Sequence, residues 1–402
     1  MGPGEKRKQT WIKLGAAAFA ALPAVALRLG GVAVAPPVAI IAFGVAIVAA
    51  AFLLIWAAEA ARRDIAGSLA TAILAIIAVL PEYAVDLYFA WSAGHVPENA
   101  QYAAANMTGS NRLLLGLGWP FVALLFFWGA RRRGERVRGI QLEPGRRLEL
   151  SFLAAASLYS LIIPFTRRLA PYDSVVLLSL FGIYLWRAAR GERSEPELIG
   201  VAETVGDLPK ARRRAAVVSM FLASTLIVLT ASAPFAQALV AGGKQLGIDE
   251  FLLVQWLAPL ASEAPELLVA SLLALRGHQD AALGTLLSAK VNQWSLLVGS
   301  LPLAFLIGGG SASGIALDAR QTEEFVLTAA QTILGFAVLV DLRLAVWEAV
   351  ALFLLFALQF PFPQTGVRLA FSAAYVAVAL ALLVRRRGDL PAIARAGLGA
   401  RN

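Results

Sequence analysis

The sequence predicts an all-α, polytopic membrane protein made of two halves inserted in opposite orientations. Three observations lead to this prediction. Of the 402 residues, 59% are hydrophobic and 15% are charged, apolar runs recur along the whole chain, and one short motif occurs twice. Soluble domains are only about 45 to 50% apolar, whereas about 20 consecutive apolar residues cross a bilayer as a helix. The composition therefore excludes a soluble domain.

About twelve apolar segments are long enough to be membrane-spanning helices. They cover residues 11–33, 36–60, 66–93, 100–129, 147–165, 173–189, 212–241, 250–276, 281–308, 320–340, 343–361 and 366–385. The first segment lacks a clear small-residue cleavage site, so we expect it to be retained as a helix. The chain contains no cysteine, which excludes disulfides and thiolate metal ligands.

The basic residues predict the topology. When the loops between these segments are assigned alternately to the two sides, most of the 35 Lys and Arg residues fall on the side of the N-terminus. The positive-inside rule then places both termini in the cytoplasm. We expect the protein to lie in a plasma (inner) membrane. We interpret the Arg clusters at 131–133, 212–214 and 385–387 as topology anchors, and we expect no binding of nucleic acid.

The repeated motif is Pro-Glu within an apolar run. Pro81 and Glu82 lie inside the run from 66 to 93, and Asp86 lies four residues past Glu82, on the same helical face. The next segment opens with a small, polar patch that includes Ser110 and Asn111. These residues form the first candidate half of a membrane-embedded polar site.

The second copy is Pro265 and Glu266, inside the run from Glu250 to Arg276. Glu263 lies three residues before Glu266 on the same face, and the following segment carries Lys290 and Gln293. Because each half contains an odd number of helices, five, the halves must be inverted relative to one another, as in many secondary transporters.

The predicted organisation is a ten-helix core with one extra helix at each end. Its parts are a cytoplasmic tail and extra helix (1–35), a first half (36–189) with its repeat at about 66–129, a cytoplasmic linker (190–211), a second half (212–361) with its repeat at about 250–308, and an extra C-terminal helix with a basic tail (362–402).

The chemistry of the motif indicates cation binding. A charged side chain at the bilayer centre costs a few kcal/mol unless it faces a cavity or a partner. Proline removes a backbone donor and frees a carbonyl oxygen beside the carboxylate, and carboxylates with carbonyls are the ligands of hard cations. In an inverted repeat the two copies meet near the midplane, so we expect Glu82 and Glu266 to face one site.

Other roles are open for the residues around this pair. The proline could serve only to kink each helix. Asp86 could form an ion pair with Arg112, and Glu263 could form one with Lys290. The small and amide side chains could serve helix packing alone.

The two motifs resemble those of the cation/Ca²⁺ exchanger superfamily, the sodium/calcium exchanger membrane region, over about residues 36–361. The resemblance rests on Leu80-Pro81-Glu82 followed by Gly109-Ser110-Asn111, and on the inverted second copy. It implies ten core helices and a glutamate from each repeat on the transported ion. These glutamates match Glu82 and Glu266, and Ser110 and Asn111 match the family's next motif.

This chain departs from the family pattern at several positions. The Gly-Thr-Ser that precedes the motif in the family reads 77–79 Ile-Ala-Val in the first repeat and 261–263 Ala-Ser-Glu in the second, which makes Ser262 a further candidate ligand. The family's last ligand position falls on Leu114 and Gln293, and the second Gly-Ser-Asn reads 288–290 Ser-Ala-Lys.

Lys290 is the most consequential departure. An ammonium near two carboxylates repels a divalent ion and can occupy a cation position itself; one such contact at 4 Å is worth about 4 kcal/mol at an effective dielectric of about 20. Buried lysines also shift their pKa readily. We hypothesise that Lys290 replaces a coupling sodium ion or loses a proton during transport, which favours proton coupling.

The predicted function is secondary active antiport of Ca²⁺ or a related metal cation against Na⁺ or H⁺ by alternating access. The partners are small inorganic cations and the lipid bilayer. We expect no cofactor and no enzymatic activity, because neither a phosphate-binding Gly-x-x-x-x-Gly-Lys nor His-Glu-x-x-His occurs. The alternatives are a monovalent-cation/proton antiporter with a degenerate Ca²⁺ site, and a non-transporting membrane scaffold or sensor.

Overall fold

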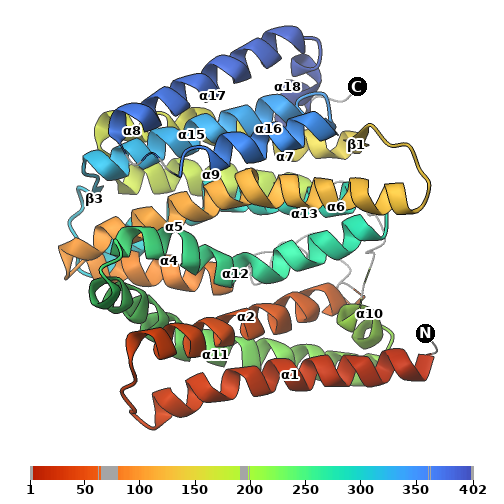
Figure 1. Cartoon of the computed structure of the whole chain (residues 1–402), viewed down its shortest axis with the longest axis vertical. Coiled ribbons are helices and arrows are strands. Elements are labelled where there is room, and N and C mark those ends of the chain that lie inside the picture. Colours follow the sequence, from red (N-terminus) through yellow and green to blue (C-terminus); the bar gives the residue numbers. More distant parts are fainter. Residues whose placement is uncertain are drawn as a thin grey trace. The chain divides into compact units, whose positions relative to one another are not determined.

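The computed structural model describes residues 3–61, 63–64, 80–190, 198, 200–360, 362 and 364–399, and most of them are helical (Figure 1). The chain forms two compact units. The first unit draws on residues 1–88 and 185–265, and the second on residues 89–184 and 266–402. Each unit therefore combines segments from both predicted sequence halves.

The first unit is a group of helices around α2. It contains α1 (Pro3–Leu29), α2 (Pro36–Ala61), α10 (Val201–Gly206), α11 (Lys210–Leu246), and the first parts of α4 (Leu80–Ala93) and α12 (Glu250–Leu275). Helices α2 and α11 lie side by side (Figure 1). Gly44 of α2 faces the Phe235 ring so closely that an added Cβ would lie 3.0 Å from it, and Ser224 Oγ donates to the carbonyl of Ala50 at 2.7 Å. Small side chains thus allow the close approach that membrane helices use in place of a hydrophobic driving force.

An ion pair ties the residues after α2 to the start of α11. Arg213 donates to both carboxylate oxygens of Asp64, at 2.8 and 2.7 Å, and also to the carbonyls of Gly206 and Leu208. The hydrogen bonds from Arg213 hold the pKa of Asp64 below its ordinary value. The carboxylate is therefore charged at neutral pH, and the bidentate geometry fixes the orientation of Arg213.

The second unit contains the remaining elements. Its first part consists of the end of α4, η1 (Pro97–Asn99), α5 (Ala100–Leu113), η2 (Leu114–Gly118), α6 (Trp119–Arg132), β1 (Gly139–Gln141), η3 (Pro144–Arg146), α7 (Arg147–Ser160), α8 (Ile163–Thr166), β2 (Arg168–Leu169) and α9 (Pro171–Ala188). The residues of α9 from Leu185 on lie in the first unit. Its second part consists of the end of α12, α13 (Gln279–Asn292), η4 (Gln293–Leu297), α14 (Val298–Ile307), β3 (Ile315–Ala316), α15 (Ala319–Leu339), β4 (Arg343–Ala345), α16 (Val346–Ala357), α17 (Thr365–Arg385) and α18 (Leu390–Leu398).

Two short antiparallel strand pairs connect loops of the second unit. Strand β1 pairs with β4, placing Ile140 opposite Leu344, and β2 pairs with β3, placing Leu169 opposite Ile315. Strands β1 and β3 lead into α7 and α15, whereas β2 and β4 lead into α9 and α16. Each strand pair thus joins a strand that precedes α7 or α15 to a strand that precedes α16 or α9. This pairing is expected if α7 and α9 in one repeat are equivalent to α15 and α16 in the other.

A π-helical turn interrupts each of two long helices at matching places. The α5 helix continues through η2 into α6, and α13 continues through η4 into α14. The first turn begins at Leu114, three positions after Asn111, and the second at Gln293, three positions after Lys290. Such turns are rare in proteins, and many of those that exist lie at functional sites.

Seven helices in the described part of the chain are long and apolar enough to cross a membrane, or eight if the bent pair Glu250–Ala264 and Glu266–Leu275 is one span. The predicted segment from 66 to 79 lies outside the described residues. These helices support a multi-pass membrane protein, while the number of twelve spans and the repeat layout stay predictions.

Gly116 in η2 provides a test of this packing. A Cβ at Gly116 would overlap the ring of Phe356 on α16. Gly116→Ala is therefore expected to lower the stability by about 1 to 3 kcal/mol, the usual cost of overpacking, measured as a lower thermal unfolding midpoint in detergent. In a Phe356→Leu background the same glycine substitution should cost less. An equal cost in both backgrounds would contradict the steric explanation.

Candidate functional site

The two positions that precede the π-helical turns contact each other in the second unit. Lys290 is completely buried, and its Nζ donates to the backbone carbonyl of Asn111 at 2.9 Å and to Oδ1 of the same residue at 2.8 Å. Nζ also lies 5.1 Å from the centroid of the Trp294 ring. The residues aligned by the two sequence repeats are thus direct neighbours in space.

Two backbone carbonyls just before the first π-helical turn accept hydrogen bonds from side chains of other helices. The carbonyl of Asn111 accepts from Lys290, and the carbonyl of Arg112 accepts from Gln331 Nε2 at 3.3 Å. The Asn111 amide nitrogen donates to the carbonyl of Met107 at 2.9 Å, which directs Oδ1 towards Lys290.

The other predicted ligands of the second unit lie on α12, α5 and η4. Glu266 on α12 is half-buried, and its Oε2 has no hydrogen-bond partner among the described residues. Ser110 is buried and donates to the carbonyl of Met107 at 3.1 Å. Gln293 is buried in η4. An unbonded carboxylate oxygen is suited to accept a cation or a proton.

The remaining candidates belong to the first unit. Asp86 on α4 and Ser262 and Glu263 on α12 are buried, and Ser262 donates to the carbonyl of Ala258 at 3.2 Å. The backbone of Glu82 lies in α4, but its side chain is outside the described residues. The described part of the chain contains no cluster of three or more His, Asp or Glu side chains arranged to hold a metal ion. The convergence of Glu82 and Glu266 stays a prediction.

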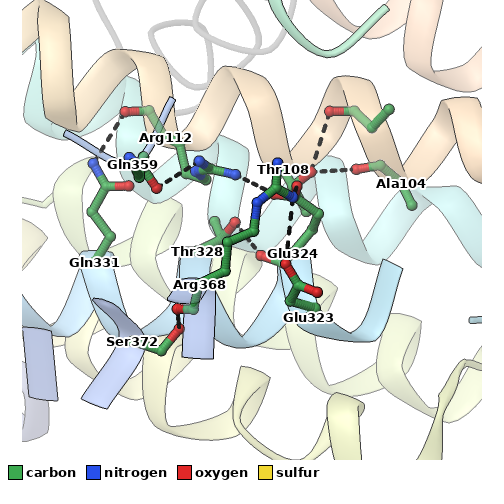
Figure 2. A network of polar contacts seen from close by, with 11 residues as sticks. Ala104, Thr108, Arg112, Glu323, Glu324, Thr328, Gln331, Gln359, Arg368 and Ser372 are labelled. Carbon is green, nitrogen blue, oxygen red and sulfur yellow. Dashed lines mark hydrogen bonds and ion pairs between the residues drawn. The ribbon is translucent and has the colours of Figure 1, made fainter. Parts of the chain in front are cut away.

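The structure also contains a buried charge cluster that the sequence analysis did not identify (Figure 2). Arg112 pairs with Glu324 and donates from Nη2 to Gln359 Oε1 at 2.7 Å. Arg368 pairs with the same Glu324 and lies 3.4 Å from Glu323. All of these residues are at most 9% exposed. Arg112, considered above as a partner of Asp86, thus forms an ion pair with Glu324.

The start of α15 places Glu324 on the buried face. Asp318 and Gln321 form a capping box in which Asp318 accepts from the Gln321 backbone at 2.7 Å, and such a box fixes where a helix begins. One turn after Glu324, Thr328 Oγ1 donates to the Glu324 carbonyl at 2.6 Å. The signal that could have revealed this cluster is a pair of adjacent glutamates within the apolar segment 320–340, since charges inside membrane segments are rare.

Comparisons with known proteins identify the family of the chain and related structures. The profile of a family described as sodium/calcium exchanger protein matches residues 36–189 and 216–362. The crystal structure of the H⁺/Ca²⁺ exchanger CAX is 39% identical to this chain, with a TM-score of 0.90, and the match covers 96% of this chain and 98% of that chain. No curated protein matches the sequence.

Two more distant structures share the fold. The Ca²⁺/H⁺ antiporter YfkE is 17% identical, with a TM-score of 0.61, over 94% of this chain and 99% of that chain. The sodium-calcium exchanger NCX_Mj is 15% identical, with a TM-score of 0.52, over 82% and 99% of the two chains. At these identities the likeness shows the fold alone.

Proposed function

Because the chain belongs to the sodium/calcium exchanger family, we propose that it is a secondary active antiporter that exchanges Ca²⁺ or a related metal cation for H⁺ by alternating access. The observation that carries the proposal is the likeness to an H⁺/Ca²⁺ exchanger, at 39% identity over 96% of the chain. The family consists of membrane transporters, so no enzymatic step is invoked.

The proposed ion site uses one glutamate from each repeat. Glu82 and Glu266 are its main ligands. The secondary ligands are Ser110, Asn111 and Glu263, and further candidates are Asp86, Ser262 and Gln293. The buried Oε2 of Glu266, which has no hydrogen-bond partner among the described residues, supports this role. The carbonyl and amide oxygens of Asn111 support it as well, because carboxylates and carbonyls are good ligands for Ca²⁺.

Lys290 supports H⁺ as the counter-ion. Its ammonium takes the two Asn111 oxygens, one carbonyl and one amide, at 2.9 and 2.8 Å. Oxygens of these two kinds are ligands for hard cations, so the tethered ammonium occupies a position that a coupling Na⁺ could otherwise use. Occupation of this position by the ammonium favours H⁺ over Na⁺ as the counter-ion.

The test is uptake of radioactive Ca²⁺ into proteoliposomes under separately imposed pH and Na⁺ gradients. An outward-directed proton gradient is expected to drive saturable uptake, and a sodium gradient of the same size is not. Uptake driven only by sodium would contradict the choice of counter-ion. If neither gradient drives uptake and the purified protein binds no cation saturably, the scaffold or sensor alternative is favoured.

Replacement of Lys290 tests whether its ammonium takes the place of a coupling Na⁺. In Lys290→Asn protein we expect a sodium gradient to drive Ca²⁺ uptake that the unsubstituted protein lacks, because the Asn111 oxygens become available to Na⁺. Lys244→Asn, at the exposed end of α11, is the matched control and should keep the original counter-ion dependence. Unchanged coupling in Lys290→Asn would remove the hypothesis.

A further inference from the structure

Arg112 lies immediately next to Asn111 but contacts a different set of helices. The Asn111 side chain and carbonyl meet Lys290 on α13, whereas the Arg112 guanidinium meets Glu324 on α15 and Gln359 after α16. Adjacent backbone positions near the end of α5 therefore connect the Lys290 contact to the charge cluster around Glu324.

Both ends of Arg112 are held. Its guanidinium is fixed by Glu324 and Gln359, and its backbone carbonyl accepts from Gln331 at 3.3 Å. Glu324 is in turn held by Arg368 of α17, which also hydrogen bonds through its own carbonyl to Ser372 at 3.0 Å. Figure 2 shows these side chains converging from α5, α15 and α17.

Stability alone is a weak explanation for such a cluster. Removing charges from water offsets most of the attraction between them, and well-packed apolar side chains are often as stable. The cluster is also unsuited to carrying a transported proton, because arginine stays protonated. The guanidinium groups of Arg112 and Arg368 balance the carboxylates of Glu323 and Glu324. The planar, five-donor fork of arginine is suited to fixing an orientation.

We propose that Arg112 is a positioning residue for the ion site, held in place by Glu324 and Arg368. It fixes the backbone from Asn111 to Leu114, where the π-helical turn begins, so that the Asn111 oxygens meet Lys290. This inference rests on the proposed function. It gives α17, which lies outside the predicted ten-helix core, a role in transport, because Arg368 of α17 holds Glu324.

Arginine-to-lysine substitutions test the proposal because they keep the charge and remove the fork. Arg112→Lys and Arg368→Lys are expected to raise the half-saturating Ca²⁺ concentration roughly tenfold or more, as losses of outer-shell partners do at metal sites. The thermal unfolding midpoint of each variant is measured in parallel. Amide hydrogen exchange in peptides covering residues 106–118 should become faster in both.

Arg386 provides the matched control, since it forms a comparable cluster at the other end of α17. It contacts Asp341 at 3.2 Å, Glu348, and the carbonyl of Val338 at 2.6 Å. Arg386→Lys should leave both the half-saturating Ca²⁺ concentration and the exchange of residues 106–118 unchanged.

The outcomes separate this inference from the proposed function. Unchanged hydrogen exchange at residues 106–118 in Arg112→Lys and Arg368→Lys would overturn the positioning role, whether or not the protein transports Ca²⁺. An equal change of Ca²⁺ dependence in Arg386→Lys would overturn it as well, because the effect would then be a general loss of stability. Absence of Ca²⁺ uptake by the unsubstituted protein would defeat the proposed function, while faster exchange in the two variants would still support the positioning role.

Discussion

Glu266→Gln is expected to lower the apparent affinity for Ca²⁺ at least about a hundredfold, so that uptake is lost at the Ca²⁺ concentration that half-saturates the unsubstituted protein. The substitution removes one negative charge and keeps the shape of the side chain. Attraction between one charge and a divalent ion at about 4 Å is worth about 8 kcal/mol at an effective dielectric of about 20. Desolvation offsets part of this, but a loss of about 3 kcal/mol already weakens binding about a hundredfold.

The measurement is the initial rate of Ca²⁺ uptake by proteoliposomes as a function of Ca²⁺ concentration. Glu82→Gln should show the same loss, because the proposed site takes one glutamate from each repeat. Glu250→Gln, in the first turn of the same helix α12, is the matched control and should retain uptake. Full activity in both Glu82→Gln and Glu266→Gln would remove the site assignment.

The sequence was sufficient to predict the helical membrane class and the family. Both follow from local features: apolar runs of membrane length, and two Pro-Glu motifs. The alignment of the repeats also placed Asn111 and Lys290 at equivalent positions. It could not show that the two side chains touch, because that contact depends on how α5 and α13 pack against each other.

The predicted helix boundaries failed where side chains redirect the backbone. The segment 343–361 was expected to be helical throughout, but it begins with strand β4, and α16 starts at Val346. Glu348 Oε2 accepts from the backbone N–H of Ala345 at 2.8 Å, which caps the helix at that point. Hydropathy does not detect such a cap, because the flanking residues Leu344 and Val346 are apolar on both sides of it.

The charge cluster was missed for a related reason. The sequence makes Arg112 a possible partner of Asp86 because Arg112 belongs to the polar patch of the first repeat. Glu324 and Arg368 lie close to the ends of their segments, where hydropathy tolerates charge. Both residues are far from Arg112 in the sequence. Only the tertiary packing of α5, α15 and α17 brings the three side chains together.

Glu324→Leu is expected to destabilise the protein by about 3 to 5 kcal/mol, the usual cost of removing one partner from a buried ion pair. The substitution would leave Arg112 and Arg368 buried without the carboxylate that both contact. The measurement is the thermal unfolding midpoint in detergent, followed by circular dichroism. Glu323→Leu is the control and should cost less, because Glu323 contacts Arg368 at 3.4 Å and its buried Oε1 accepts no hydrogen bond.

A variant without any of the four charges separates stability from positioning. Changing Arg112 and Arg368 to Met and Glu323 and Glu324 to Leu leaves no uncompensated charge, so the unfolding midpoint should return close to that of the unsubstituted protein. Ca²⁺ uptake should remain impaired, because no guanidinium then fixes the backbone beside Asn111. A variant as unstable as Glu324→Leu would show that the cluster is itself a net source of stability. Recovery of the original Ca²⁺ dependence together with stability would show that the ion site does not need Arg112.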